Sequence, residues 1–328
     1  MDVKLPDGVD EFLGEAGWGG AAIEPLTGDA SFRRYFRVRQ GERSAMLMDA
    51  PPPREDVGPF LRAARWLDAN SMRAPAIHAD DADRGLVLLE DFGEARMRDY
   101  LDQWPGDEDE TYRAAVDALV ELHQLPPGPF LDYSMSEYQR EARLLIDWYC
   151  PAQNLAVDGQ AYTEAWEEVM CQLLPRQRPG VTVLRDYHAE NIMLLGSLQK
   201  QGLLDFQDAL VGHPAYDLVS LLQDARREVS PQLEARMFDH YRSRTGVDEA
   251  QFLADYARLG AQRNAKIVGI FVRLWKRDGK PRYLELIPRV WSLLERDLSH
   301  AALAPVAKWF DENIPRELRE AGGGQFAA

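Results

Sequence analysis

Residues 181–217 read VTVLRDYHAENIMLLGSLQKQGLLDFQDALVGHPAYD, and this stretch decides the fold of the 328-residue chain. Its apolar runs at 181–184, 192–195 and 202–205 are typical of short strands, and GSLQKQ separates the last two as the turn of a hairpin does. Asp186 and Asn191 precede the hairpin, and Asp205 ends its return strand. We therefore expect three oxygen-bearing side chains at one end of a small sheet, which suits magnesium binding and phosphoryl transfer.

The specificity of this pattern comes from its context. An Asp followed five residues later by an Asn occurs by chance about once in a chain of this length, and such a pair alone fits a solvated loop equally well. His188, the neighbouring strands and the D-F-x-D of residues 205–208 make coincidence much less probable. The combination favours a catalytic site.

This segment resembles the catalytic segment of the aminoglycoside phosphotransferase-like kinases, relatives of the protein kinases, in which H-G-D-x-H-x-x-N precedes I-D-F-x-D. The resemblance implies that Asp186 is the catalytic carboxylate, which orients the substrate hydroxyl and accepts its proton. It also implies that His188 belongs to the catalytic set and braces the loop. By the same resemblance, Asn191 and Asp205 hold the Mg²⁺ that bridges the phosphates of ATP.

Four further positions in this segment follow from the resemblance. Leu184 and Arg185 replace the first His and Gly of the family, a departure that affects the support of the loop more than its chemistry. GHPAYD at 212–217 matches the G-x-P-x-x-D of the family, and we expect Asp217 to brace the loop. Asp208 is assigned to the substrate side.

The remaining patterns predict an α+β fold with two lobes, like that of a protein kinase. The first ninety residues are arranged β-β-α-β, with a hairpin at 33–38 and 44–48, a helix at 57–69 and a strand at 85–90. We expect a small antiparallel N-lobe over 1–92, ending in the hinge, and a mostly helical C-lobe over 93–328. Helical periodicity occurs at 112–123, 137–150, 161–174, 232–244, 249–275 and 284–298.

Two stretches of the expected N-lobe resemble nucleotide-binding elements of the family. TGDASFRRYFRV at 27–38 is similar to the loop that covers the nucleotide, and LLEDFG at 88–93 is similar to the hinge that pairs with adenine. The nucleotide-binding residues expected from this resemblance are Gly28, Ala30, Ser31, Phe32, Arg33, Arg34, Arg43, Glu90 and Phe92.

The chain has no lysine between Lys4 and Lys200, so the phosphate-binding lysine that these kinases carry on the third strand is absent. Either the protein is a pseudokinase or a guanidinium group from Arg33, Arg34 or Arg43 holds the phosphates, as arginine can in bidentate fashion. We favour the arginine, because Asp186 and Asp205 are both present.

Several stretches together, among them MDAPPP at 48–53 and residues 262–284, resemble the bacterial anomeric kinases of cell-wall amino sugars. This implies ATP-dependent phosphorylation of the C1 hydroxyl of N-acetylmuramate and N-acetylglucosamine in peptidoglycan recycling. The candidate sugar-binding residues are Glu141, Asp147, Trp148, Asp208 and Arg263. Gln262, Arg263, Lys266 and Arg273 form a basic stripe that either captures a lactyl carboxylate or phosphate or pairs with surface acids.

Composition limits the partners. Lys plus Arg number 38 against 54 Asp plus Glu, and the net charge of −16 disfavours nucleic acids and anionic membrane surfaces. With no signal-like segment or long apolar run, the sequence predicts a cytoplasmic enzyme that binds a small sugar and ATP. An aminoglycoside or choline-type kinase, whose cationic substrate suits an acidic chain, and a nucleotide-binding pseudokinase remain the alternatives.

Overall fold

The computed structural model describes residues 5–26 and 33–326. Contacts within the chain divide it into two compact units. The first unit runs up to Pro105 and includes Glu190–Ala209, and the second comprises Gly106–Ala189 and the chain from Leu210 onward. Within the described ranges, no helix is both long and apolar enough to cross a membrane.

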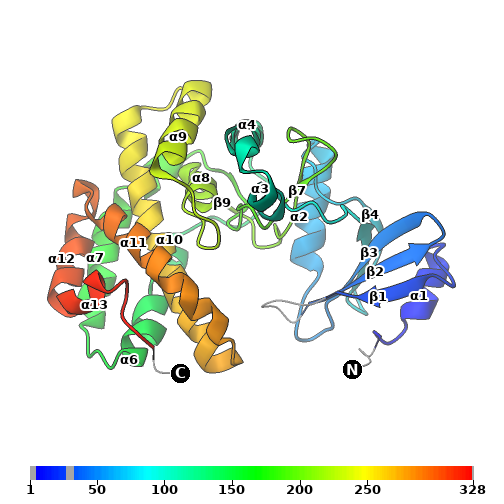
Figure 1. Ribbon diagram of the computed structural model, residues 1–328, viewed down its shortest axis with the longest axis horizontal. Coiled ribbons are helices and arrows are strands. Elements are labelled where there is room, and N and C mark those ends of the chain that lie inside the picture. Colours follow the sequence, from blue (N-terminus) through cyan, green and yellow to red (C-terminus); the bar gives the residue numbers. More distant parts are fainter. Residues whose placement is uncertain (1–4, 27–32, 327–328) are drawn as a thin grey trace. The chain divides into compact units, whose positions relative to one another are not determined.

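The first unit contains a five-stranded antiparallel sheet in the order β1-β2-β3-β5-β4 (Figure 1). The expected hairpin is β2–β3, the expected helix is α2 and the expected third strand is β5. The sequence did not reveal β1, β4 or α1, which are short or lack clear alternation. The elements are α1 (Val9–Glu15), β1 (Ala22–Pro25), β2 (Arg34–Gln40), β3 (Arg43–Asp49), α2 (Gly58–Ala69), β4 (Ile77–Asp81), β5 (Leu86–Glu90) and α3 (Met97–Gln103).

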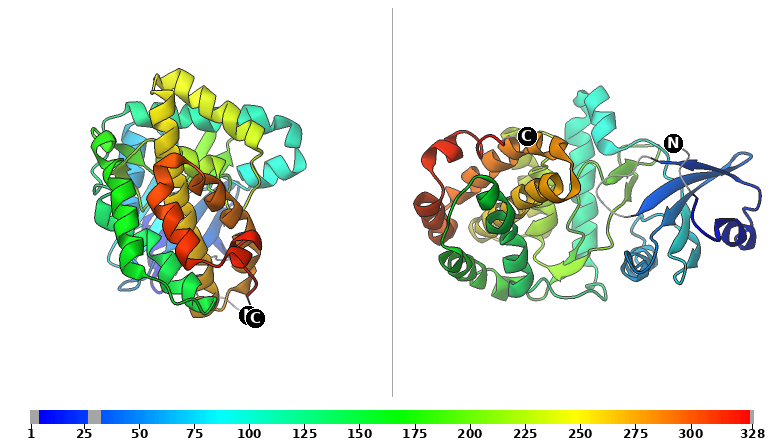
Figure 2. Two further views of the ribbon diagram at one scale, coloured as in Figure 1. Left: turned by 90° about the vertical axis from the view of Figure 1, so that its left-hand side faces the viewer. Right: turned by 90° about the horizontal axis from the view of Figure 1, so that it is seen from below.

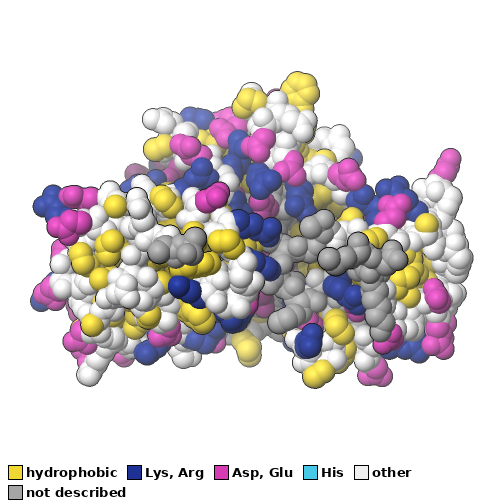
Figure 3. All heavy atoms as spheres, turned by 60° about the horizontal axis from the view of Figure 1, so that its bottom comes forward, with side chains coloured by type: hydrophobic (Ala, Val, Ile, Leu, Met, Phe, Trp, Pro, Cys, Tyr) yellow, Lys and Arg dark blue, Asp and Glu magenta, His cyan; other side chains and the backbone are white. Residues whose placement is uncertain are grey.

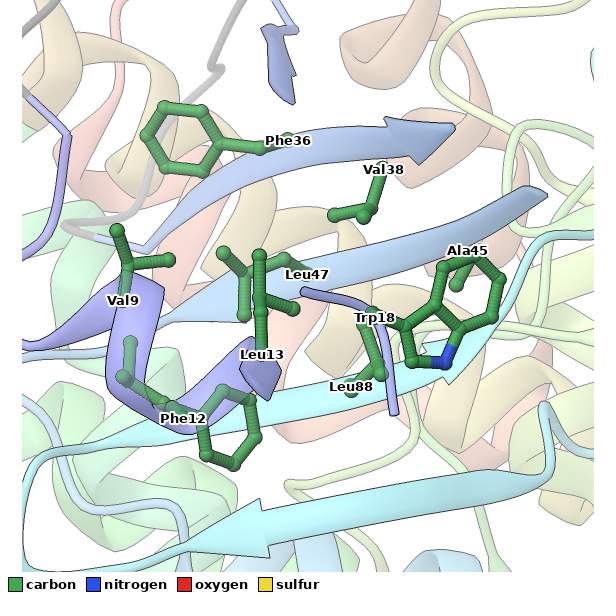
Figure 4. Close-up of a cluster of buried hydrophobic side chains, with 10 residues drawn as sticks. Val9, Phe12, Leu13, Trp18, Phe36, Val38, Ala45, Leu47 and Leu88 are labelled. Carbon is green, nitrogen blue, oxygen red and sulfur yellow. The ribbon is translucent and has the colours of Figure 1, made fainter. Parts of the chain in front are cut away.

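Helix α1 covers one face of this sheet, where alternate apolar residues of β2, β3 and β5 form a buried cluster with it (Figure 4). Phe36 and Leu47 of the sheet are fully buried in this cluster, as are Phe12 and Trp18 on the covering side. Because strand side chains alternate, Tyr35, Arg37 and the methionines of β3 belong to the opposite face.

The hairpin β7 (Ile192–Leu194) and β8 (Gln201–Leu203) belongs to the first unit. Its main chain bonds to that unit: the Leu194 N–H donates to the Ala95 carbonyl at 2.8 Å, and the Leu203 N–H donates to the Arg73 carbonyl at 2.8 Å. By their contacts, residues 93–105 and the hairpin therefore belong to the same unit as the sheet. The sequence predicts both of them in the helical lobe. The functional lobe boundary at residue 92 stays a prediction.

The second unit is helical apart from the two-stranded pairing of β6 with β9. Its long helix α10 packs against α5, α8 and α11, and both views of Figure 2 show it running through the bundle. The expected helix at 137–150 is split into α5 and the π-helical turn η2. The main elements are α4 (Glu108–Gln124), α5 (Met135–Ala142), η2 (Leu145–Tyr149), α6 (Cys150–Ala152), α7 (Gly159–Cys171), β6 (Val181–Val183), β9 (Leu210–Gly212), α8 (Ala215–Leu222), α9 (Pro231–Thr245), α10 (Glu249–Asp278), α11 (Ile287–Leu298), α12 (Ala304–Asn313) and α13 (Arg316–Glu320).

Asp297 of α11 is a buried carboxyl group inside this bundle. Gln223 Nε2 donates to its Oδ1 at 3.0 Å, and Asn264 Nδ2 donates to its Oδ2 at 3.2 Å. A Cβ at Gly260 would lie 2.4 Å from Asp297 Oδ2, so only glycine leaves room for the carboxyl group there. Burial raises the pKa of Asp297 to about 8, against these two hydrogen bonds, which favour the ionised form.

We predict that Asp297 makes the stability of the protein fall as the pH rises. The pKa of the carboxyl group is about 3.8 when the chain is unfolded and about 8 when it is folded, so stability is lost as the pH rises between these values. The loss is at most about 1.4 kcal/mol per pH unit. Between about pH 5.5 and about pH 8, the thermal midpoint of the wild type should therefore drop more than that of Asp297→Asn. Asp239→Asn, which changes an exposed carboxylate, should track the wild type; parallel pH profiles for all three proteins would contradict the assignment.

Candidate active site

The catalytic loop, residues 184–189 of the second unit, is held by the buried carboxylate of Asp217. The Leu184 N–H donates to Asp217 Oδ2 at 2.6 Å, and the Arg185 N–H donates to its Oδ1 at 2.8 Å. Burial raises the pKa of Asp217 to about 7, and the two N–H donors act in the opposite direction. The prediction that Asp217 braces the loop is confirmed.

Arg185, which stands at the glycine position of the family pattern H-G-D-x-H-x-x-N, adopts a left-handed backbone with φ of 72°. This conformation costs a non-glycine residue about 1 kcal/mol or more. Its guanidinium forms a close ion pair with the buried Glu141, which also pairs with Lys266 Nζ at 2.9 Å. The Tyr133 hydroxyl donates to the same carboxylate. These contacts offset the strain and fix the residue next to Asp186.

Asp186 is a half-buried carboxylate surrounded by positive charge. Burial acts to raise its pKa, but the positive charges of Lys266, Arg263 and Arg185, in decreasing order of effect, hold the pKa below its ordinary value. The group is therefore ionised near neutral pH and able to accept a hydrogen bond from a hydroxyl group.

His188 is buried two residues after Asp186, and its Nε2 lies 3.5 Å from a guanidinium nitrogen of Arg226. Burial lowers its pKa, so the imidazole is neutral near pH 7. On the other side of the loop, the Tyr187 hydroxyl donates to the Ala115 carbonyl of α4 at 2.9 Å. Both contacts suit residues that hold the loop in place.

Asn191 and Asp205 meet at the open end of the β7–β8 hairpin in the first unit. Asn191 Nδ2 donates to Asp205 Oδ2 at 3.4 Å, and the Leu204 N–H donates to the Asn191 carbonyl at 2.9 Å. β8 ends at Leu203, so Asp205 lies beyond the strand rather than within it, in a left-handed conformation with φ of 58°. The expected pairing of these two oxygen-bearing side chains is present, and the carboxylate is exposed.

Arg33 and the carboxylate of Asp205 both act on Tyr35. The Nε of Arg33 donates to Glu55 Oε2 at 3.3 Å, just before α2. Burial raises the pKa of Tyr35, the positive charge of Arg33 opposes this shift, and the negative charges of Asp205 and Glu55 add to it. Arg33, Glu55 and Asp205 therefore all lie within electrostatic range of Tyr35 in the first unit.

A known family model matches most of the chain. The model of the phosphotransferase enzyme family matches residues 22–259. The chain belongs to the phosphotransferase enzyme family. It is 36% identical to an N-acetylmuramate/N-acetylglucosamine kinase of Caulobacter vibrioides, over 94% of this chain and 96% of that protein. It is 39% identical to the protein of that name from Pseudomonas aeruginosa, over 90% and 89%.

The fold of the family is shared with a solved structure. The ADP-bound aminoglycoside phosphotransferase APH(2'')-Ib superposes with a TM-score of 0.62 at 15% sequence identity, covering 89% of this chain and 97% of that one. The α+β class and the two-lobe kinase-like fold expected from the sequence are confirmed by this likeness and by the five-stranded antiparallel sheet with its helical remainder.

The three arginines proposed to replace the family's lysine have different partners in the structure. Arg34 pairs with Asp49 across β2–β3, with 2.7 Å between Nε and Oδ2. Arg43 stacks on the Trp18 ring, 4.1 Å from its centroid, on the side that α1 covers. Of the three, Arg33 is the one that acts on Tyr35 together with Asp205. Arg34 and Arg43 are therefore engaged elsewhere.

The expected hinge is held within the first unit. Glu90 pairs with Arg73 through both oxygens, at 2.7 and 2.5 Å, and the Glu90 N–H donates to the Ala76 carbonyl at 2.8 Å. The Arg73 guanidinium lies 4.6 Å from the centroid of the Phe92 ring. Of the Glu90 backbone groups, only the carbonyl could pair with adenine. Gly28, Ala30, Ser31 and Phe32 lie outside the described residues.

The candidate sugar-binding residues do not converge. Glu141 is 1% exposed and forms an ion pair with Arg185. The prediction that it binds sugar hydroxyls is therefore wrong. Arg263 is 4% exposed and donates to Ser220 Oγ at 2.8 Å, which places it inside the bundle rather than on the expected stripe. Asp147 is exposed and pairs with Arg143, Trp148 is half-buried beside it, and Asp208 is exposed in the other unit.

Sequence reasoning missed the partners that support the site. Glu55 had no signal beyond its place before a helix, and Tyr35 appeared only as part of a strand. Lys266 was placed in a surface stripe, whereas it pairs with Glu141 under the catalytic loop. Such pairs join residues that are far apart in the chain, and their side chains meet only after folding.

Proposed function

We propose that this protein is an ATP-dependent kinase that phosphorylates the C1 hydroxyl of N-acetylmuramate and N-acetylglucosamine in peptidoglycan recycling. The observation that carries the proposal is the similarity, over about nine tenths of the chain, to enzymes named for these two sugars. The retained Asp186, Asn191 and Asp205 supply the groups that phosphoryl transfer needs. The cytoplasm, where ATP is abundant, is the proposed location.

In this proposal, Asp186 receives the acceptor hydroxyl. The positive charges around it keep the carboxylate ionised, so it orients the hydroxyl and accepts its proton as the bond to phosphorus forms. An anomeric hydroxyl is more acidic than a primary alcohol, because the ring oxygen withdraws electron density. A single carboxylate therefore has less proton transfer to assist at C1 than at C6.

Asn191 and Asp205 are the proposed Mg²⁺ ligands. Across the described ranges, no group of three or more His, Cys, Asp or Glu residues could hold a metal ion. An exposed carboxylate beside an amide suits Mg²⁺, which keeps several waters and takes the rest of its oxygen ligands from nucleotide phosphates. When bound, the ion would neutralise charge on those phosphates.

We predict that Asp186→Asn abolishes turnover while ATP affinity stays close to that of the wild type, since Asp186 is assigned to the acceptor hydroxyl. Asp205→Asn should weaken Mg²⁺-dependent ATP binding as well as turnover. Steady-state kinetics and calorimetric titration of ATP with Mg²⁺ measure both effects. An Asp186→Asn enzyme that keeps most of its kcat would contradict the assignment.

We predict that Arg33 replaces the missing lysine. Arg33→Ala should raise the KM for ATP by about tenfold or more and lower kcat, since a charge-assisted hydrogen bond to phosphate is lost. Arg33→Lys should recover part of the activity. Arg34→Ala and Arg43→Ala make the same change of charge at positions paired with Asp49 and Trp18, and their KM for ATP should stay at the wild-type value. Wild-type ATP kinetics in Arg33→Ala would place the cation elsewhere.

We predict that the enzyme phosphorylates N-acetylglucosamine and N-acetylmuramate at C1, giving products that no longer reduce at that carbon. Glucose should be poorer by a factor of about 10 to 100, because the groups that bind the acetamido group would be left unpaired. Phosphorus NMR of the products and a panel of acceptors test this. Equal use of glucose, a product that still reduces, or turnover of aminoglycosides or choline instead would reject the proposal.

A further inference from the structure

Arg273 of α10 is a half-buried arginine that has no hydrogen bond or ion pair within the described residues, and its Nε is fully enclosed. The positive charges of Arg277 and Arg140 act on Arg273. The acid that acts on it is Asp278, and Arg277 already donates hydrogen bonds to both carboxylate oxygens of Asp278, at 2.7 and 2.9 Å. Burial and these neighbouring cations lower its pKa. An arginine left without an acid is unexpected in a chain with a net charge of −16.

Arg140 is one of the cations whose charge acts on Arg273, and Lys266 lies on the same helix, α10. Lys266 precedes Arg273 by seven residues, which is two helical turns or about 10 Å along the same face of α10. Arg140 of α5 is mostly exposed and pairs with Glu137 at 2.5 Å. On the surface seen in Figure 3, basic and acidic side chains are mostly interspersed.

The packing of α10 on η2 fixes this arrangement. A Cβ at Gly269 would lie 2.3 Å from the backbone carbon and oxygen of Leu144, so the two segments approach as closely as glycine allows. Long side chains on a helix lean toward its N-terminus, so Arg273 extends over the turn that contains Gly269, in the direction of Lys266. Lys266 in turn lies among the charges that act on Asp186.

Charge around Glu141 leaves this region positive. Three cations, Arg185, Lys266 and, at 4.0 Å, Arg140, lie against the single carboxylate of Glu141, and Arg273 adds a charge with no ion-paired acid among the described residues. Arg185 and Lys266 also act on Asp186, and Arg140 acts on Arg273, so the positive charge at the proposed acceptor position continues toward Arg273 and suits an acceptor that carries a negative charge. N-acetylmuramate differs from N-acetylglucosamine by a lactyl ether that ends in a carboxylate.

We propose that Arg273, with Arg140 and Lys266, binds the carboxylate of N-acetylmuramate and so determines the preference between the two amino sugars. This inference rests on the proposed function. Guanidinium binds carboxylate in bidentate fashion, and the half-buried position of Arg273 strengthens such a pair by excluding water. A sugar without the lactyl group would leave the subsite without a partner.

The test compares the two sugars in one variant. Arg273→Gln should lower the ratio of kcat/KM for N-acetylmuramate to kcat/KM for N-acetylglucosamine by about tenfold, mainly through the KM for N-acetylmuramate. Arg273→Lys should recover part of the ratio. Arg277→Gln, one turn further along and paired with Asp278, is the matched control and should keep the wild-type ratio. Thermal unfolding checks that each variant is folded.

The outcomes separate the two proposals. An unchanged ratio in Arg273→Gln overturns the subsite, as does an equal fall for both sugars. A raised KM for ATP at an unchanged sugar ratio would assign the arginine to nucleotide phosphate and overturn it as well. A wild-type enzyme that phosphorylates neither sugar would reject the proposed function, and the subsite with it.

Discussion

The active-site geometry of the second unit depends on one buried carboxylate. Asp217 receives the N–H groups of Leu184 and Arg185, and so fixes the backbone from which Asp186 projects. Burial raises the pKa of Asp217 to about 7, so the two N–H donors are needed to keep its charged form accessible near neutral pH. The contact holds the residue after β6 against the first turn of α8.

The same loop shows how a departure from the family pattern is accommodated. At the glycine position of the family pattern, Arg185 adopts a left-handed backbone that favours glycine. Its guanidinium contacts Glu141, which also receives Lys266 and Tyr133. Lys266 and Arg185 outweigh the effect of burial and hold the pKa of Glu141 at about 2. The strained residue is thus retained by a network that also brings positive charge to Asp186.

In the first unit, the strand that carries the lysine in the family pattern has methionines. They lie on β3, and Arg33, just before β2, pairs with Glu55. The β7–β8 hairpin is bonded to this unit through Ala95 and Arg73, so Asn191 and Asp205 belong to the unit of the sheet and not to that of the catalytic loop. The chain therefore passes from one unit to the other between Ala189 and Glu190, inside the catalytic segment itself.

The sequence by itself determined the elements whose signal is local. The strands and the hairpin of 181–217 and the helix over 249–275 follow from apolar periodicity, the spacing brought Asn191 together with Asp205, and the family resemblance identified Asp217 as a brace. The tertiary structure alone decided which of the three arginines acts on Tyr35 together with Asp205, that Glu141 is buried beneath the loop, and that Arg273 lacks an acidic partner. The physical reason is that periodicity records only which face of an element is buried. Ion pairs between distant segments depend on how those faces pack, and a charged residue has the same signal in sequence whether its partner is water, another side chain or a substrate.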